Sequence, residues 1–237
     1  MEFLTYSEVA STQETARILA AEGRALPFAV VAETQSRGRG RRGKNWDSPR
    51  GGLWLTLALA VPSAGAVHQS AIVAAHAVAT VVLTATGLHT LVKWPNDLLV
   101  ERRKVCGILA ETLVQTDTTL LMVGIGLNVN NVVPPDQLPQ ATSLKAELEH
   151  DLDVWQLATS VVTMVQLDIG TLITAGFDPF TPWIETSLAL REELVTVEFN
   201  HQRTSGRVAG VSRTGALLLK NPNGSLEEVD AGSVYNW

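Results

Sequence analysis

The residues most able to do chemistry lie in one short loop, SRGRGRRGKNW, at residues 36–46. Its arginines offer planar forks that pair with carboxylate or phosphate oxygens, and Trp46 offers a flat face to a base or ring. Glycine lets the backbone approach a ligand and adopt positive φ, as we expect at Gly38, Gly40 and Gly43. The loop therefore predicts a site for an anion beside an aromatic base.

The same loop nearly matches a phosphate-binding P-loop, because four residues separate Gly38 from Gly43 and Lys44. The next residue, Asn45, replaces the Ser or Thr that contacts magnesium in that motif. A P-loop also opens a helix, whereas residues 45–52 contain a proline and two glycines and predict irregular chain. These differences disfavour a P-loop. A solvated basic surface loop is the alternative that the stretch alone leaves open.

Positive charge is concentrated around this loop in a chain of net charge −6. Residues 37–50 hold six of the 18 Lys and Arg, against a single acid, Asp47. A nucleic-acid-binding module, the rival of another class, is basic over a broad face. Focused positive charge suits a small anionic ligand better.

Three further motifs carry polar residues at the ends of apolar runs. KWPND, residues 93–97, is on its own simply a turn, although strand ends often carry function. In RKVCGILAE, residues 103–111, Lys104 is either an edge residue or a cation aimed into a pocket, and Gly107 indicates that a ligand or another backbone approaches closely. GIGLNVN, residues 124–130, indicates either a bulge or a ligand close to the strand.

Other reactive side chains give weaker signals. Cys106 lies in an apolar run and is expected to be a buried, unreactive side chain. The sequence has no G-x-S-x-G elbow and no Cys/His pair at zinc-ligand spacing, which disfavours a serine hydrolase and a structural zinc site. Ser11 and Thr12 are expected to cap a helix, with Glu14 completing a capping box.

The elements that must position these motifs alternate along the chain. Helices are predicted at residues 11–23, 69–85, 153–175 and 182–188. Strands are predicted at residues 27–33, 51–61, 90–95, 96–100, 104–114 and 119–130, with a hairpin turn at 115–118 and a loop at 134–139. Short strands at tight spacing follow, at residues 193–200, 203–212, 215–221 and 226–230.

This order predicts a mixed α/β domain, residues 1–188, followed by a small β domain, residues 189–237. The chain has 237 residues, and its 46% apolar content is ample for a core. The N-terminus has no secretory pattern, and the longest apolar segment, residues 71–83, is too short to span a bilayer. A cytoplasmic protein is expected.

The joint order of these motifs resembles that of the biotin–protein ligases, also called biotin–[acetyl-CoA carboxylase] ligases. The motifs are, in order, STQ at residues 11–13, the loop with its preceding ETQ, KWPNDLL, RKVCGILAE and GIGLNVN. The resemblance covers nearly the whole chain. The arginine loop followed by KWPND is highly specific to that family, and lipoate ligases share the fold but not this pair. The fold implied is α/β (α+β), a class II synthetase-like catalytic domain with a mixed sheet and a C-terminal SH3-like β-barrel.

The resemblance implies a two-step reaction with biotin and ATP as substrates and Mg²⁺ as the metal. Biotin and ATP give biotinyl-5′-AMP and pyrophosphate, and a lysine of a biotin carboxyl carrier domain then takes the biotin. No protein nucleophile is needed. The resemblance implies no DNA or membrane partner, since STQ begins at residue 11 and leaves no room for the DNA-binding domain of some relatives. It leaves a homodimer open.

Site residues are carried over by matching position. Biotin-binding roles fall on Ser11, Thr12, Gln13, Gln35, Gly38, Arg39, Gly40, Arg41, Lys104 and Gly107. ATP-binding roles fall on Arg39, Arg41, Lys44, Trp46, Lys93, Asn96 and Asn128, with Trp46 and Asn128 resembling a pair that sandwiches adenine. Catalytic roles fall on Lys104, Arg41 and Asp97. Gln13 and Lys44 depart from the frequent Asn and Arg of the family, and Arg37 has no assigned role. The like charges and glycines of the loop predict disorder before anions arrive.

Overall fold

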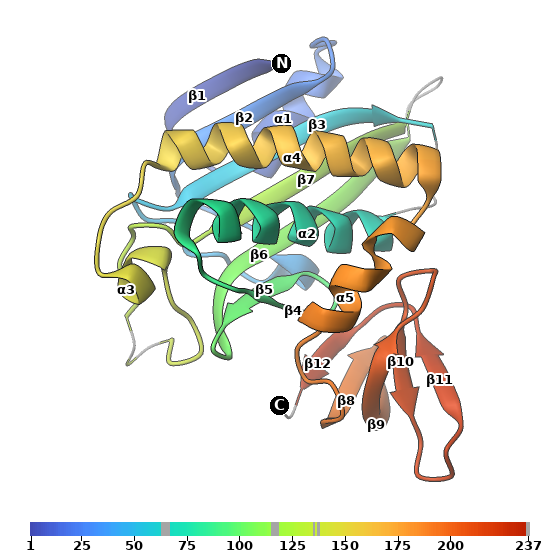
Figure 1. The fold of residues 1–237 in the computed structure, drawn as a ribbon. Helices are drawn as coiled ribbons and strands as arrows, with labels where there is room; N and C mark the ends of the chain where they lie inside the picture. Colours follow the sequence, from blue (N-terminus) through green and yellow to red (C-terminus); the bar gives the residue numbers. More distant parts are fainter. Residues whose placement is uncertain (63–66, 115–118, 135, 137, 236–237) are drawn as a thin grey trace.

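The computed structural model describes residues 1–237 except 63–66, 115–118, 135, 137 and 236–237 (Figure 1). It contains a seven-stranded mixed sheet and a five-stranded antiparallel sheet. The hairpin turn predicted at residues 115–118 and part of the loop predicted at 134–139 lie outside the described residues.

The larger sheet has the order β1-β2-β3-β7-β6-β5-β4. Strands β1 and β2 pair in parallel, and every other neighbouring pair is antiparallel. The strands are β1 (Glu2–Val9), β2 (Phe28–Gln35), β3 (Leu53–Val61), β4 (Leu91–Lys93), β5 (Asp97–Val100), β6 (Arg103–Val114) and β7 (Thr119–Leu127). The mixed sheet of the expected fold class is thereby confirmed.

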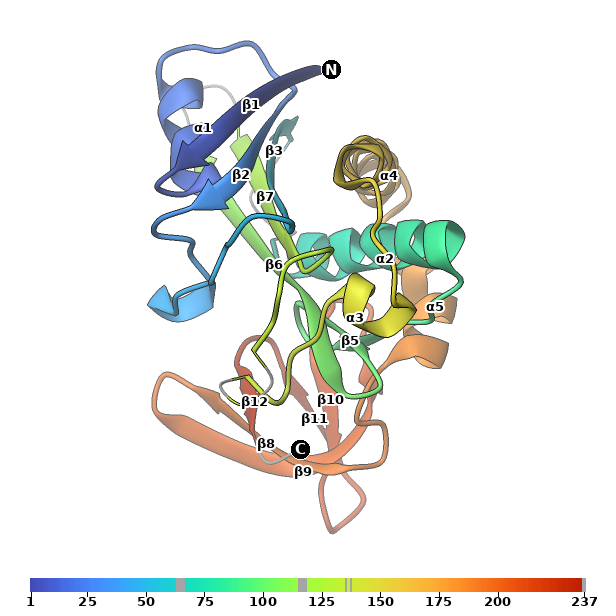
Figure 2. The same cartoon turned by 90° about the vertical axis from the view of Figure 1, so that its left-hand side faces the viewer.

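Helices cover both faces of this sheet. Helices α2 (Val67–Thr86) and α4 (Val154–Ala175) lie side by side on one face, and α1 (Thr12–Ala21) lies on the other (Figures 1 and 2). By length and composition alone, both α2 and α4 are long and apolar enough to cross a membrane. The longest apolar segment predicted from the sequence, residues 71–83, was therefore shorter than the apolar helices of the structure. Their apolar faces pack on the sheet as the main core of the domain.

The alternation of side chains along the central strands assigns each residue to a face. On β3, Leu53, Leu55 and Leu57 join the core under α2 and α4, whereas Ala58 joins the smaller core under α1. Thr56 shares the α1 face and is fully buried. The face under α1 is therefore the one that can present polar groups to a ligand.

The smaller sheet is formed by the last five strands of the chain, after helix α5 in the sequence. Its order is β11-β10-β9-β8-β12, from strands β8 (Leu194–Phe199), β9 (Gln202–Val211), β10 (Leu217–Lys220), β11 (Leu226–Val229) and β12 (Ser233–Tyr235). Trp94 joins it to the larger sheet, since its buried indole Nε1 donates to Gly215 O at 2.9 Å. Short helices α3 (Leu144–Leu148) and α5 (Thr181–Ser187), with one-turn 3₁₀ segments at Arg41–Gly43 and Asp178–Phe180, complete the fold.

Some local features differ from the sequence analysis. Strand β1 and helix α3 were not predicted at all. Of the two alternatives for residues 124–130, a bulge does not occur within β7, which keeps a continuous register with both neighbours as far as Leu127. Ser11 occupies the N-cap position of α1, but its side chain makes no capping hydrogen bond, so the expected capping box does not form.

Candidate functional site

A cavity of about 430 Å³ opens on the α1 face of the larger sheet. Its described lining combines the start of α1, the arginine loop, the β4–β5 turn and the glycine-bearing strands β6 and β7. From the predicted site it includes Ser11, Thr12, Gln13, Gln35, Arg39, Gly40, Arg41, Lys44, Trp46, Asn96, Asp97, Lys104, Gly107 and Asn128. Motifs far apart in the sequence thus meet in one place, while their individual roles remain predictions.

Glycines on two adjacent strands make a shelf on which Trp46 lies. A Cβ atom at Gly107 would lie 2.8 Å from the Trp46 ring, and one at Gly126 would lie 2.5 Å from its Nε1. Both contacts are closer than real Cβ atoms tolerate, so the ring requires glycine at both positions. The sequence predicted that a ligand or another backbone approaches these strands, whereas the group that approaches them in the structure is the Trp46 side chain.

A bulge on β6 turns Lys104 toward this shelf. The β5–β6 register shifts between Leu98, which faces Cys106, and Leu99, which faces Lys104, and the shift leaves Val105 as the extra residue. Residues three apart on a regular strand lie on opposite faces, but a Cβ at Gly107 would lie only 3.1 Å from Lys104 Nζ. The bulge therefore explains how Lys104 and Gly107 reach the same side.

Three groups with predicted catalytic roles are held by short polar contacts. Lys104 Nζ lies 2.7 Å from Asp97 Oδ1 and 4.8 Å from the centre of the Trp46 ring, a cation–π distance. Arg41 Nη1 donates to Asn96 Oδ1 at 3.0 Å, and Asn96 Nδ2 in turn donates to Ile108 O at 2.9 Å. The β4–β5 turn thus positions a lysine and an arginine together.

Three arginines of the loop hold it in place, and each of the three contacts a different element. Arg39 pairs with Glu14 of α1 at 3.5 Å, and Arg41 bonds to the β4–β5 turn. Arg42 donates to Glu198 O of β8 at 2.9 Å, and its guanidinium carbon lies 5.8 Å from the centre of the Phe199 ring. Divergent anchoring offsets the mutual repulsion of the loop's cations.

The backbone of the loop differs from the prediction in one respect. Positive φ occurs at Gly43 and at Arg42, a non-glycine residue, but not at Gly38 or Gly40. A Cβ at Gly38 would collide with Trp46 O, and this crowding explains the glycine. Gly38 therefore lies behind the cavity wall, outside the described lining.

A chain of hydrogen bonds runs along the inner wall of the cavity. Gln35 Oε1 accepts from the backbone N–H of Thr12 at 2.8 Å and from its hydroxyl at 3.1 Å, and Gln35 Nε2 donates to Ser48 Oγ at 2.7 Å. Thr56 Oγ1 lies 2.9 Å from the Thr12 hydroxyl. Among the described residues, the Ser11 hydroxyl has no hydrogen-bond partner, which leaves it available to a ligand.

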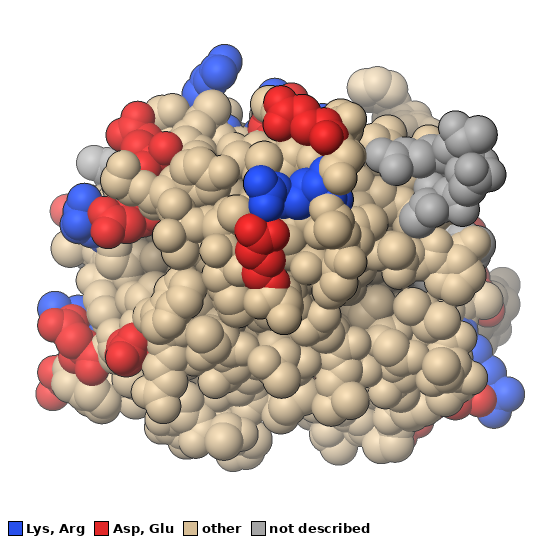
Figure 3. All heavy atoms as spheres, turned by 90° about the horizontal axis from the view of Figure 1, so that it is seen from above, with Lys and Arg blue, Asp and Glu red and all other residues tan. Residues whose placement is uncertain are grey.

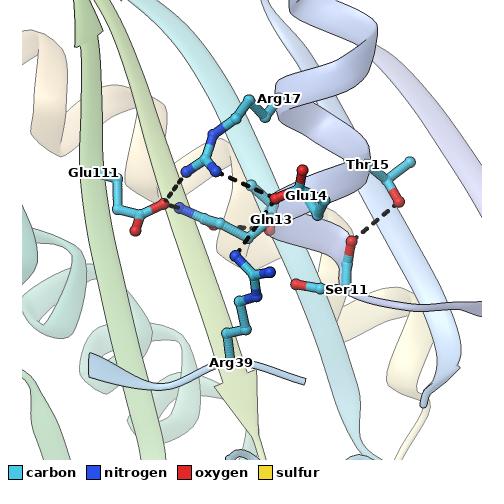
Figure 4. Close-up of polar contacts among 8 residues, drawn as sticks. Ser11, Gln13, Glu14, Thr15, Arg17, Arg39 and Glu111 are labelled. Carbon is cyan, nitrogen blue, oxygen red and sulfur yellow. Dashed lines mark hydrogen bonds and ion pairs between the residues drawn. The ribbon is translucent and has the colours of Figure 1, made fainter. Parts of the chain in front are cut away.

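The inner wall continues into a charged network on α1 and β6 (Figure 4). Gln13 Nε2 donates to Glu111 Oε2 at 3.0 Å, and Arg17 donates to the same oxygen at 2.8 Å. Arg17 also reaches Glu14 at 3.2 Å, and Glu14 pairs with Arg39 of the loop. The network links an amide in the cavity wall to the arginine loop.

Burial and neighbouring charges shift the pKa values of three side chains. The pKa of Lys93 is lowered to about 8, mainly by burial; the Asp97 carboxylate opposes this shift, and the charges of Lys104 and Lys44 add to it. Burial and then Arg42 lower the pKa of Arg41. Burial raises the pKa of the Cys106 thiol, so this cysteine stays protonated and its expected inertness is supported. Lys93 itself, predicted to bind ATP, is outside the described cavity lining.

The cavity wall includes Asn128 and also residues that sequence reasoning overlooked. The Asn128 amide donates to Thr142 O at 2.9 Å and accepts from Asn131 at 3.1 Å, so both its NH₂ group and its carbonyl oxygen already make hydrogen bonds within the protein. Thr56 and Asn131 line the cavity, and Glu111 lies behind it. A threonine inside the apolar run LWLTLALA is a signal that could have identified Thr56.

The charge of the surface was expected to argue against a nucleic-acid-binding module. On the face seen from above in Figure 3, most of the surface is uncharged, and Lys and Arg lie beside Asp and Glu. Several exposed cations are paired, including Arg24 with Glu2 at 2.9 Å and Arg50 with Glu33 at 2.6 Å. That face presents no broad basic patch.

Comparison with known proteins identifies the family. Residues 9–130 match the biotin/lipoate A/B protein ligase family, and residues 192–237 match the biotin protein ligase C-terminal domain. The bifunctional ligase/repressor BirA of Bacillus spizizenii is 32% identical over 94% of this chain and 71% of its own length. The biotin--[acetyl-CoA-carboxylase] ligase of Paracoccus denitrificans is 32% identical, with 87% of this chain and 89% of the relative covered.

A solved structure gives the same answer at the level of the fold. The biotin protein ligase of Aquifex aeolicus, in complex with biotin and ATP, superposes with a TM-score of 0.88 and 28% identity. The match covers 99% of this chain and 97% of the other, so it includes both sheets. With both domains matched in sequence and in fold, the chain belongs to the biotin protein ligases.

Proposed function

We propose that this protein activates biotin with ATP and transfers it to a lysine of a biotin carboxyl carrier domain. The observation that carries the proposal is the meeting, in one cavity, of an uncharged polar wall with a cluster of cations beside Trp46. The wall suits the ureido ring of biotin. The cations suit the carboxylate and α-phosphate that must be brought together.

In the first step, a carboxylate oxygen of biotin attacks the α-phosphorus of ATP. The new P–O bond gives biotinyl-5′-AMP, and the bond to the β-phosphate breaks to release pyrophosphate. Charge accumulates on the α-phosphoryl oxygens in the transition state, where Lys104 and Arg41 stabilise it from fixed positions. Holding both substrates in one cavity adds the advantage of orientation.

In the second step, the ε-amine of the acceptor lysine attacks the acyl carbon of the mixed anhydride. The C–O bond to the phosphate breaks, AMP leaves, and the amine loses a proton as the amide forms. We assign to the Asp97 carboxylate, which lies beside Lys104 in the cavity wall, the role of accepting this proton. Cys106 takes no part, because its buried thiol is protonated.

We extend the proposal to Mg²⁺ as the partner of ATP. The described lining contains two carboxylates, Asp47 and Asp97, and the described residues hold no cluster of three or more His, Cys, Asp or Glu side chains suited to a metal. Mg²⁺ commonly takes one or two carboxylates together with substrate phosphates, which fits this donor set. When bound, the ion neutralises phosphate charge, while Asp97 and Asp47 are the residues that would hold it.

The acceptor is proposed to be a carrier domain of acetyl-CoA carboxylase or a similar carboxylase, as the name of the Paracoccus relative indicates. The test incubates the protein with ATP, Mg²⁺, a carrier domain and either biotin or lipoate, and follows intact mass. Addition of one biotin to one lysine is expected. Lipoate addition without biotin addition would overturn the assignment. Labelling of the carrier that persists when ATP is omitted would overturn it as well.

A further inference from the structure

Glu111 is hydrogen-bonded to a residue of the cavity wall, yet neither step of the proposed reaction involves it. Its carboxylate lies on β6 behind the cavity wall, where one oxygen, Oε2, accepts from both Gln13 and Arg17 (Figure 4). Gln13 is only 4% exposed, whereas the Glu111 side chain is 37% exposed. A half-exposed carboxylate thus reaches a buried amide of the cavity wall.

The chemistry of these groups fixes how the Gln13 amide is oriented. An ionised carboxylate only accepts hydrogen bonds, so the NH₂ of Gln13 must face Glu111 and its carbonyl oxygen must face away. That oxygen, Oε1, lies 3.2 Å from Thr56 Oγ1, which shares its single hydroxyl proton between Gln13 Oε1 and the Thr12 hydroxyl oxygen at 2.9 Å. Without a strict acceptor at Glu111, the amide could turn over and present NH₂ to Thr56 instead.

The orientation matters because it sets which polar atoms line the inner wall. Gln13 Oε1 lies over Gly124, where an added Cβ would be 2.6 Å away, so the oxygen sits tightly against β7. Thr56 is also in contact with the Thr12 hydroxyl, which continues to Gln35. Fixing the amide therefore fixes acceptor oxygens along the wall, and acceptors match the N–H donors of a ureido ring.

We propose that Glu111 is a positioning residue for the ureido ring of biotin and acts through the Gln13 amide. The inference rests on the proposed function and adds to it a residue that need not touch the substrate.

Arg17 supplies the control for this assignment. Its ion pair with Glu111 joins two side chains that are both more than one-third exposed, so it contributes little to stability. Arg17→Met removes the ion pair but leaves the carboxylate free to accept from Gln13. Glu111→Met removes the acceptor with little change in size, and Glu111→Gln restores an amide oxygen that can accept.

The experiment measures biotin KM and kcat in carrier labelling, biotin affinity without ATP, and melting temperature. Glu111→Met should raise biotin KM and Kd about tenfold, with kcat at saturating biotin changed less than about twofold. Glu111→Gln should recover most of the affinity, and Arg17→Met should stay within about twofold of the wild type. Melting temperatures of folded variants should lie close together.

Two results would overturn the inference. Unchanged biotin KM in Glu111→Met would make Glu111 a surface ion-pair residue. An equal rise in Glu111→Met and Arg17→Met would assign the effect to charge pairing instead of amide orientation. Failure of the proposed function itself is separate, because the wild type would then neither bind biotin nor label the carrier.

Discussion

Lys104 Nζ lies 2.7 Å from Asp97 Oδ1, which pairs two groups of predicted catalytic role within the cavity wall. Both side chains are less than one-third exposed, so the pair is shielded from water. The contact also keeps the ammonium over the Trp46 ring. A cation fixed before substrate arrives needs no reorganisation when charge develops on the α-phosphoryl group.

Replacing Lys104 should therefore damage chemistry more than folding. Lys104→Ala should lower kcat/KM for adenylation by at least about 100-fold, the scale of losing one charge-stabilising donor. Pyrophosphate release measures this step. Lys145→Ala is the matched control, because Lys145 makes a similar 2.8 Å pair with Asp151 outside the cavity. A large loss of stability in Lys104→Ala, with normal activity per folded molecule, would give Lys104 a structural role instead.

Arg41 should show the same pattern in the arginine loop. Arg41→Ala removes a partly buried guanidinium and its bond to Asn96, and adenylation should fall by about 100-fold or more. Arg37→Ala removes an exposed cation of the same loop and should change the rate less than about twofold. Equal effects would mean that general positive charge is what matters. Normal turnover in Arg41→Ala would contradict its assigned role.

Lys93 should make the use of ATP depend on pH. Since the folded pKa of Lys93 is about 8, its charge is present at pH 7 and is lost as pH rises toward 9. We expect kcat/KM for ATP to fall across that interval in the wild type. Lys93→Arg keeps its charge and should stay flat there, while Lys93→Met should be low throughout. A fall of the same size in Lys93→Arg would assign the titration to another group.

The contact between the arginine loop and the C-terminal domain should slow ligand release. Arg42 reaches both the Glu198 carbonyl and the face of Phe199, and its positive φ is an uncommon conformation for a non-glycine residue. Arg42→Ala and Phe199→Ala should each speed release of biotinyl-AMP about two- to fivefold. The double variant should release no faster than Arg42→Ala, because the two residues share one contact. Fully additive effects would show that they act separately.

Much of the fold could be predicted because its strands and helices carry strong periodic patterns. The apolar run of β3 and the long apolar helices α2 and α4 are examples. Strand β1 was missed because its exposed and half-buried residues do not alternate cleanly, and it gains strand structure by pairing with β2. Helix α3 has only five residues, too few for a pattern.

The members of the site could be predicted better than their arrangement. Most of the carried-over residues line one cavity, but Lys104 reaches it through a bulge at Val105 that the apolar sequence does not reveal. Glu111 was missed because its contact with Gln13 spans 98 residues and exists only when α1 packs on the folded sheet. Such contacts depend on tertiary packing, which motif spacing does not encode.

The most direct test of the central claim is intact-mass analysis of a carrier domain incubated with this protein, biotin, ATP and Mg²⁺. The account predicts one added biotin on one lysine, formed only when both biotin and ATP are present, and loss of that product in Arg41→Ala. A carrier that remains unmodified by the folded wild-type protein, or that accepts lipoate and not biotin, would contradict it.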